Sequence, residues 1–331
     1  MKCKIDRFSI NEPFIARSLR RVTILPISEV MRRGVIFALK QIKHGVLPFP
    51  QNLHIEVTNH CNLSCPMCVY PGQSRPRGFM DFALFEKIIS QCRGEFFLEK
   101  VALMGLGEPF LHPDIIQMSR YAKEHNIKHV YTSTNATLLN ERISRDILEQ
   151  PGFDALAISL DGATKEVYES IRKGAKFDDV VNNVISFVKM RSMLRKNKPR
   201  LVLQFLIMKE NYQQKDMFVK FWQERLSKDD VILLRDVDTF GGQVPDHRLV
   251  SQVPSIRRVP CVQLWRDLMI SWNGDVTVCC KDVNYILKIG NLSEDSIKSL
   301  WKSKNWENMR LLHSKCKWGQ IGLCANCSEW G

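Results

Sequence analysis

Six short apolar runs, rich in β-branched residues, alternate with amphipathic helical patterns between residues 51 and about 240. Each run has the length of a buried parallel strand. This alternation predicts an α/β domain with an all-parallel sheet, either doubly wound or curled into a partial (β/α)6 TIM-like barrel. In both geometries ligands bind at the carboxyl ends of the strands. The expected strands are Leu53–Val57, Val101–Met104, His129–Thr132, Ala155–Leu160, Leu201–Met208 and Val231–Val237. The expected helices are Phe82–Cys92, Asp114–His125, Glu141–Glu149, Lys165–Ile171, Asp178–Arg195 and Gln213–Leu226, with Asp81 and Thr164 among their caps.

The length and composition are those of a globular protein. The chain has 331 residues, of which 44% are hydrophobic and 25% charged, so it can bury a large core. This composition excludes intrinsic disorder and a small disulfide scaffold. No apolar run reaches the roughly 18 to 20 residues that span a bilayer, and Met1 to Ile10 lack the apolar stretch of a signal peptide. We therefore expect a cytoplasmic protein with two domains, or with one large barrel and an appendage.

Residues 1–50 are expected to form a basic N-terminal extension. They carry ten Lys or Arg residues against three acids, in a chain whose net charge is +13. Ser28 to His44 have the periodicity of an amphipathic helix that Pro48 and Pro50 would end. Such a helix can lie on an acidic membrane surface or bind a nucleic-acid backbone. The more ordinary alternative is that it packs on the next domain and keeps its charges in water.

The sequence changes character after residue 250. Gln252 to Pro260 have the composition of a linker, so the expected domains are residues 1–50, 51–250 and 251–331. Apolar runs at Leu268–Trp272 and Val276–Cys279 flank Asn273-Gly274, which predicts a β-hairpin with a type I′ turn. The C-terminal domain is too small for a large core of its own, and a bound metal would supply the missing stability.

The eleven cysteines indicate a metal site near each end of the expected α/β domain. In a reducing compartment, clustered thiols are more often metal ligands than disulfides. Cys61, Cys65 and Cys68 follow the first expected strand. A structural zinc site takes four protein ligands, and only His60 stands nearby as a fourth. In a cubane 4Fe-4S cluster, three thiolates would leave one iron open to another ligand.

The second group of cysteines lies in the last domain. Cys261 and Cys279 bracket the expected hairpin, and Cys324 and Cys327 form a Cys-x2-Cys pair. Four thiols brought together in this way fit a zinc ribbon as well as an iron–sulfur cluster. The remaining cysteines are Cys3 and Cys92, which we expect to be structural, and Cys280 and Cys316, which are left over.

The spacing Cys-x3-Cys-x2-Cys at Cys61, Cys65 and Cys68 resembles that of the radical SAM superfamily. The resemblance implies that the open iron holds S-adenosylmethionine, and that an electron cleaves this cofactor to a 5′-deoxyadenosyl radical that takes a hydrogen atom from the substrate. It also implies an external electron donor of the flavodoxin or ferredoxin type. The family often has an aromatic residue before the third cysteine, in contact with adenine. Met67 stands in that place here.

Other segments of the resemblance fall after the expected strands. Gly105-Leu106-Gly107-Glu108-Pro109 is similar to the Gly-Gly-Glu segment that holds the methionine ammonium group, with one glycine of that run replaced by leucine while Gly107 and Glu108 remain. Thr132-Ser133-Thr134-Asn135 is similar to a Thr-Asn-Gly segment, with Ala136 in the glycine place. The residues that the resemblance assigns to the cofactor are Met67, Gly105, Gly107, Glu108, Thr134, Asn135, Ser159 and Arg172, the last two for the ribose or the carboxylate.

The C-terminal cysteines and the Trp272-Asn273-Gly274-Asp275 segment resemble the SPASM and twitch domains of radical SAM enzymes. The resemblance implies one auxiliary 4Fe-4S cluster, bound by Cys261, Cys279, Cys324 and Cys327. Full ligation would suit it to accept or relay an electron. If Cys316 also served as a ligand, a second partial cluster would be possible. Alternatively, Cys280 or Cys316 could donate a hydrogen atom to the substrate, as a cysteine does in radical SAM epimerases.

The single auxiliary cluster favours an oxidoreductase similar to the twitch dehydrogenase that oxidises a secondary alcohol of an aminocyclitol. Its base and polar substrate contacts would then come from Gln204, Arg235, Asp236 and Asp238, near the ends of the fifth and sixth strands. An epimerase or a peptide-modifying maturase remains an alternative. A metal-stabilised module that binds nucleic acid is less favoured, because no aromatic residues are interleaved with the basic ones and no zinc knuckle is visible.

Overall fold

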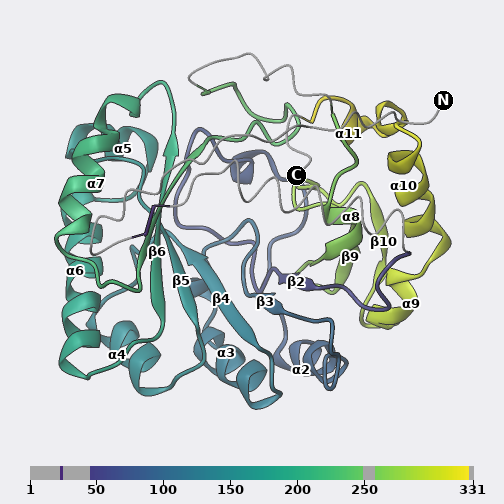
Figure 1. The fold of residues 1–331 in the computed structure, drawn as a ribbon, viewed down its shortest axis with the longest axis horizontal. Coiled ribbons are helices and arrows are strands. Elements are labelled where there is room, and N and C mark those ends of the chain that lie inside the picture. The colour runs from purple at the N-terminus through teal and green to yellow at the C-terminus, as the bar shows by residue number, and fades with distance from the viewer. Residues whose placement is uncertain (1–22, 25–44, 249–257, 328–331) are drawn as a thin grey trace, which may run out of the picture.

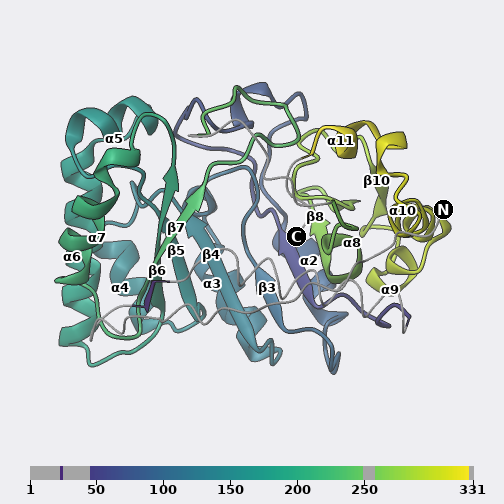
Figure 2. The same cartoon turned by 45° about the horizontal axis from the view of Figure 1, so that its top comes forward.

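A computed structural model describes residues 23–24, 45–248 and 258–327 of the chain. The strands form one ten-stranded sheet in the order β1-β7-β6-β5-β4-β3-β2-β8-β9-β10. From β2 to β7 the spatial order follows the chain without reversal, which excludes the doubly wound alternative, because that topology changes direction in the middle of the sheet. The sheet curls but does not close, so the expected partial barrel is confirmed (Figures 1 and 2).

The six expected strands of the core are present and all run parallel. Their apolar positions are almost fully buried: Leu53, Val101, Leu156 and Leu203 are each 0% exposed. A parallel sheet needs cover on its outer face, and the crossover helices supply it. The strands are β2 (Asn52–Ile55), β3 (Lys100–Ala102), β4 (His129–Thr134), β5 (Ala155–Ser159), β6 (Arg200–Ile207) and β7 (Val231–Asp236).

The crossover helices lie along the convex side of this sheet, as Figure 1 shows. Asp81 caps α2, as expected, by accepting a hydrogen bond from the Ala83 backbone N–H at 2.7 Å. Thr164 stands at the N-cap of α5 but makes no side-chain cap, because its hydroxyl accepts from the Gln214 amide instead. The helices are α2 (Phe82–Ser90), α3 (Ile115–Glu124), α4 (Glu141–Glu149), α5 (Lys165–Ile171), α6 (Phe177–Met193) and α7 (Lys215–Gln223).

The C-terminal domain continues the sheet of the barrel. Strand β8 (Asp267–Ile270) pairs in parallel with β2, and β9 (Asp275–Thr277) and β10 (Lys288–Asn291) follow in antiparallel order. The expected hairpin is therefore confirmed. Its turn is not type I′, because among the loop residues only Gly274 has a positive φ (+86°). The Gly274 N–H donates to Ser271, so a type I turn is followed by a left-handed glycine.

Four helices complete this domain: α8 (Gln263–Arg266), α9 (Ile297–Trp301), α10 (Lys304–Ser314) and α11 (Gly322–Ala325). Its small core is built on two fully buried indoles, Trp301 and Trp306, whose ring centroids lie 4.9 Å apart. The Arg310 guanidinium lies over the Trp301 ring at 4.2 Å and donates to the Leu264 and Trp301 carbonyls. These contacts fix α10 against α8.

Little of the N-terminal extension belongs to the described residues. The two residues of β1, Thr23–Ile24, pair in parallel with β7 at the edge of the sheet. The helix expected at Ser28 to His44 and most of the linker at Gln252 to Pro260 lie outside the described residues. The membrane contact that depends on this helix has no support here. Among the described helices, none is long and apolar enough to cross a membrane.

Candidate active site and auxiliary cysteine cavity

The loop after β2 brings Cys61, Cys65 and Cys68 to the carboxyl end of the sheet, as expected. Tyr70 holds this loop: its hydroxyl accepts from the Cys61 N–H at 3.1 Å and donates to the Cys61 carbonyl at 3.0 Å. The Tyr70 N–H in turn donates to the Cys68 sulfur at 3.4 Å. Met67 is 3% exposed and packs in the hydrophobic core. Its contact with adenine stays a prediction.

The thiols of this loop suit iron ligation. Burial raises the pKa of Cys61 to about 11 and raises the pKa values of Cys65 and Cys68, so without metal the thiols are neutral. A bound cluster reverses this preference, because it supplies the positive charge that stabilises thiolates. Arg172 lies close by, with its Nη1 atom 3.9 Å from the Cys65 sulfur.

Glu108 lies at the centre of the segments that we expect to bind the cofactor. It is 2% exposed, at the end of the loop that follows β3. Its carboxylate accepts from the Thr134 hydroxyl at 2.7 Å, from the Asn135 N–H at 2.8 Å and from the Phe110 N–H at 3.2 Å. Burial raises the pKa of Glu108, although these hydrogen bonds oppose the shift. The structure thus brings together Glu108, Thr134 and Asn135, which the sequence placed after neighbouring strands.

Position 107 requires a glycine because the backbone of the loop after β2 approaches it closely. A Cβ atom there would lie 2.4 Å from the Thr58 carbonyl oxygen and 2.5 Å from that of His60. The Glu108 N–H donates to the same His60 carbonyl at 2.8 Å. Gly105 is equally tight, since its Cβ atom would meet the Glu56 side chain at 2.5 Å. The two glycines therefore let the loop after β3 pack on the loop after β2, which carries the cysteines.

Ala136 occupies the place that glycine has in the related segment. It adopts φ +57°, a left-handed conformation that costs a non-glycine residue roughly 1–2 kcal/mol. The strain is held by neighbouring contacts: the Ala136 N–H donates to the Thr134 hydroxyl at 3.0 Å, and its carbonyl accepts from the Asn183 amide at 3.0 Å. The backbone geometry of the segment is thus kept without the glycine.

Arg172 is held in place by a buried acid. Its guanidinium pairs with Asp161, which is 0% exposed and also accepts from the Leu206 N–H at 2.7 Å. Burial alone would lower the pKa of Arg172, but the charge of Asp161 raises it. Ser159 is half-buried at the end of β5, opposite Gln204 in the sheet. The contacts of Ser159 and Arg172 with the cofactor stay predictions.

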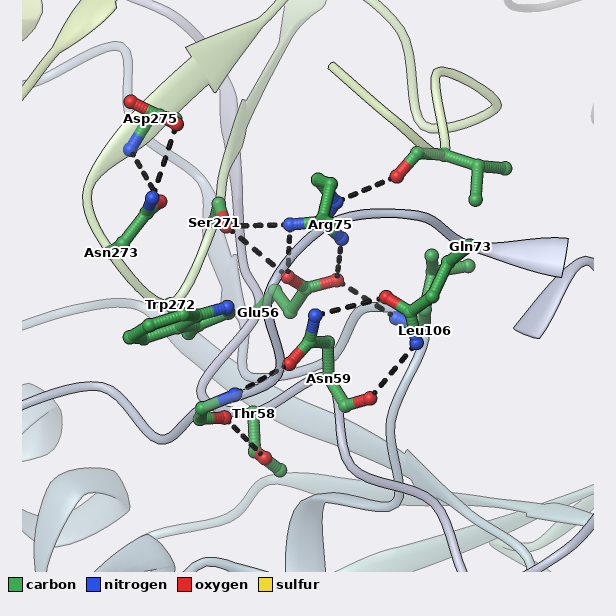
Figure 3. A network of polar contacts seen from close by, with 12 residues as sticks. Glu56, Thr58, Asn59, Gln73, Arg75, Leu106, Ser271, Trp272, Asn273 and Asp275 are labelled. Carbon is green, nitrogen blue, oxygen red and sulfur yellow. Dashed lines mark hydrogen bonds and ion pairs between the residues drawn. The ribbon is translucent and has the colours of Figure 1, made fainter. Parts of the chain in front are cut away.

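A polar network that the sequence did not suggest fixes the chain beyond the cysteine loop to the C-terminal domain (Figure 3). The Arg75 guanidinium donates to both oxygens of Glu56, at 2.9 and 3.0 Å, and to the Ser271 hydroxyl at 2.7 Å. The indole of Trp272 donates to the Pro76 carbonyl at 3.2 Å. The only sequence signal was an acid within the expected strand Leu53–Val57, so the partner of Glu56 could not be foreseen.

The four C-terminal cysteines expected to bind the auxiliary cluster line one cavity. Burial raises the pKa of Cys261 to about 12 and that of Cys324 to about 11. Four cysteines around one cavity are a donor set that suits a 4Fe-4S cluster. The cavity is lined by Cys261, Cys279, Cys324 and Cys327, with Arg258, Gln263, Lys281, His313 and Leu323.

The two left-over cysteines do not line this cavity. Cys280 is exposed, and its thiol donates to the Gln263 side chain at 3.5 Å, next to the start of α8. Cys316 is disulfide-bonded, so its sulfur carries no hydrogen atom to donate in that state. The hydrogen-donor role of Cys280 stays a prediction.

The register of β6 and β7 separates the candidate substrate residues. Phe205 packs on α7, with 4.9 Å between its ring and that of Phe218, so alternate residues of β6 face the helices. Gln204 therefore faces the barrel interior, and Arg235, opposite Leu206, shares that face. Asp236 pairs with Ile207 on the helix side, which removes it from the candidate bases. Asp238, beyond the strand, pairs with Lys281.

A partial barrel with a three-cysteine loop at its open end defines a radical SAM protein, and comparison with known proteins agrees. The radical SAM superfamily model matches residues 55–192, and the model of the SPASM iron–sulfur cluster-binding domain matches residues 261–328. The chain therefore belongs to the radical SAM superfamily and carries a C-terminal SPASM domain. Its cofactors are 4Fe-4S clusters and S-adenosylmethionine.

Individual relatives extend the comparison over most of the chain. The tungsten-containing aldehyde ferredoxin oxidoreductase cofactor-modifying protein of Pyrococcus furiosus is 24% identical over 316 residues, covering 83% of this chain and 86% of that relative. The crystal structure of BtrN in complex with AdoMet and 2-DOIA has a TM-score of 0.57 at 19% identity, over 84% of this chain and 93% of BtrN. The crystal structure of Streptococcus suis SuiB bound to precursor peptide SuiA has a TM-score of 0.66 at 18% identity. The match covers 92% of this chain and 75% of SuiB.

Proposed function

We propose that this protein oxidises a secondary alcohol of a small, sugar-like substrate such as an aminocyclitol, with the auxiliary cluster as electron acceptor. The observation that carries the proposal is the cavity lined by Cys261, Cys279, Cys324 and Cys327. Four thiolates would saturate a cluster there and leave no iron for substrate. Such a cluster is suited to taking an electron, and a net oxidation needs an acceptor.

The reaction balances as a two-electron oxidation. When bound, S-adenosylmethionine and its cluster supply the 5′-deoxyadenosyl radical, and the auxiliary cluster supplies an oxidant for one electron. The carbinol C–H hydrogen atom leaves for the radical, the hydroxyl proton leaves for a base, and the remaining electron leaves for the oxidised auxiliary cluster. The product is a ketone, together with methionine and 5′-deoxyadenosine. An external donor of the flavodoxin or ferredoxin type would supply the electron that starts the reaction.

The residues of the chain would bind the cofactor and handle the proton. Glu108, organised by Thr134 and Asn135, would hold the methionine ammonium group, and Arg172 would place positive charge beside the cluster loop. Asp238 is the candidate base. It lies beyond the carboxyl end of β7 and pairs with Lys281, a lining residue of the auxiliary cavity. This position would let the proton and the electron leave the substrate on the same side.

The comparisons support a small substrate. BtrN, whose structure was solved with AdoMet and 2-DOIA, is matched over 93% of its length. A second candidate, a peptide-modifying maturase, is favoured by the TM-score of 0.66 with SuiB, which was solved with its precursor peptide.

The test uses protein purified and reconstituted under anaerobic conditions. Iron and sulfide are counted, and dithionite-dependent 5′-deoxyadenosine formation is compared for wild type and Cys65→Ala. Aminocyclitols and related sugars deuterated at the carbinol carbon are then supplied. We expect about eight iron atoms per chain, in two cubane clusters, with deuterium transferred to 5′-deoxyadenosine and one ketone formed per cofactor cleaved. Replacement of the carbinol deuterium by hydrogen in a product of unchanged oxidation state, or turnover of peptides alone, would exclude the dehydrogenase.

A further inference from the structure

His313 lies at the wall of the auxiliary cavity, and only one of its two ring nitrogens has a hydrogen-bond partner among the described residues. It lies in the last turn of α10, is 1% exposed and lines the cavity with the four cysteines. The Cys261 backbone N–H donates to its Nδ1 atom at 3.2 Å. Its Nε2 atom is buried without a hydrogen-bond partner among the described residues. Buried polar atoms are rarely left in this state, so an absent group is the expected partner.

The hydrogen bond from Cys261 determines the tautomer of the ring. A nitrogen that accepts a hydrogen bond carries no proton, so the proton of the neutral imidazole is on Nε2. Nε2 is therefore a hydrogen-bond donor.

The same tautomer argues against His313 as a metal ligand. Ligation through Nε2 would move the proton to Nδ1. The Nδ1–H and the Cys261 N–H would then be two hydrogen-bond donors facing each other, with no acceptor between them. Ligating histidines normally donate their second N–H to an acceptor, and here that position is occupied by a donor. The acceptors that a filled cavity offers are sulfur atoms, from the four thiolates and from the inorganic sulfide of a cluster.

We propose that His313 donates an N–H···S hydrogen bond to the auxiliary cluster and thereby keeps its reduction potential higher. Reduction adds negative charge to the cluster, and a donor at sulfur stabilises the reduced form more than the oxidised form. His313 is thus a positioning and tuning residue, not a ligand. The inference depends on the four-cysteine cluster and holds whether or not the substrate is an alcohol.

The test observes the auxiliary cluster alone and without substrate. In the full chain, Cys61→Ala, Cys65→Ala and Cys68→Ala together remove the first cluster, and the reduced auxiliary cluster is studied by pulsed EPR. Protein labelled with 15N-histidine, in H2O and in D2O, should show a weakly coupled histidine nitrogen and an exchangeable proton. A potentiometric EPR titration gives the potential of the same sample.

Three variants separate the two ring nitrogens. His313→Asn can keep a partner for the Cys261 N–H but does not extend to the cavity, His313→Gln can place an amide donor near Nε2, and His313→Phe removes both. We expect His313→Asn and His313→Phe to lose the proton coupling and to shift the one-electron equilibrium about tenfold toward the oxidised cluster, or about 59 mV. His313→Gln should restore most of the proton coupling and most of the reduction potential.

Two results would contradict the proposed hydrogen bond. Unchanged couplings and potential in all three variants would overturn the proposal, and the strong nitrogen coupling of a bound imidazole would make His313 a ligand. Iron analysis shows whether each variant retains its cluster. If His313→Phe loses it, the isotope comparison on the protein with the native histidine still decides, because absence of a histidine coupling there excludes the hydrogen bond. None of these readouts depends on substrate, so failure of the proposed alcohol oxidation would be recognised separately.

Discussion

Asp238 and Lys281 form a buried ion pair that joins the end of the barrel to the auxiliary cavity. Their side chains are 9% and 6% exposed. Asp238 follows β7, the last barrel strand, and Lys281 lies two residues after Cys279, which we expect to bind the auxiliary cluster. Gln243 reinforces the junction by donating to the Lys281 carbonyl at 2.8 Å. The segment after β7 thus carries the contact between the two cysteine sites.

Breaking this pair from one side should be costly. Lys281→Met leaves the Asp238 carboxylate buried without its partner, and we expect a loss of about 3–5 kcal/mol in the free energy of unfolding. The double variant Asp238→Asn/Lys281→Met should recover much of this loss, because no uncompensated charge remains. Anaerobic unfolding of the reconstituted chain, with iron counted in each sample, measures the free energy of unfolding of the single and the double variant. Additive single and double effects would show that the two charges do not interact.

Asp238→Asn also tests the proposed base. The amide keeps the shape of the side chain but cannot accept the hydroxyl proton, and general-base catalysis contributes typically 10²–10⁴-fold. Because Asp238→Asn also leaves the Lys281 ammonium buried without its carboxylate, activity is compared only on protein whose iron content shows both clusters, and there we expect ketone formation to fall by about that factor. Cofactor cleavage without substrate should be unchanged. Arg235→Gln serves as a comparison, since Arg235 faces the barrel interior but cannot act as a base at neutral pH. Full ketone formation in Asp238→Asn would assign the proton to another group.

Glu108 should control the affinity for S-adenosylmethionine. In Glu108→Gln one oxygen becomes an NH2 group, which must face either the Asn135 N–H or the Thr134 hydroxyl. Hydrogen bonds to a charged group contribute about 1.5–3 kcal/mol, so the dissociation constant should rise by roughly 10- to 100-fold. Thr134→Val removes one neutral donor and should have a smaller effect. Anaerobic equilibrium dialysis measures both, and equal affinities for wild type and Glu108→Gln would remove Glu108 from the cofactor site.

The barrel strands were predictable because their sequence signals are local. Each buried run, such as Leu201–Met208, is apolar and flanked by a helical pattern. Because the strands are parallel, their carboxyl ends all lie at the same edge of the sheet. The cysteine spacings were equally direct, since three thiols on one loop need no tertiary information. Glu108, Thr134 and Asn135 could be placed together for the same reason: each follows the carboxyl end of a parallel strand.

What the sequence missed depends on contacts between distant segments. The Glu56–Arg75–Ser271 network joins residues up to 215 positions apart in the chain, and no periodicity reports such a contact. The parallel pairing of β8 with β2 was missed because the hairpin signal described only the antiparallel partner of β8. Asp236 ends its strand as expected, but its face could not be foreseen, because a shift of one residue in a strand changes the face on which a side chain lies.

Gly107 and Gly72 form a matched pair for testing the tight contact between the loops. Both lie near the cysteine loop, but a Cβ atom at Gly107 would be 2.4 Å from the Thr58 carbonyl, whereas nothing lies within 4 Å of one at Gly72. Gly107→Ala must displace backbone and should reduce both iron at the first cluster and cofactor cleavage. Gly72→Ala should resemble wild type. Equal behaviour of the two variants would show that the loops adapt without loss.

The position of Cys280 can be tested by its reactivity. Iron holds the thiols of the cluster ligands in the reconstituted protein, and Cys92 is 3% exposed with a pKa that burial raises. Cys280 is exposed and outside the auxiliary cavity, so iodoacetamide should modify it before Cys92 or any cluster ligand. Peptide mapping by mass spectrometry, under anaerobic conditions and with iron monitored, identifies the site. Cys280→Ser should abolish the early modification and retain both clusters and ketone formation. Protection of Cys280 together with loss of iron in Cys280→Ser would instead make it a ligand, and the auxiliary site would then hold more than the four cysteines that line its cavity.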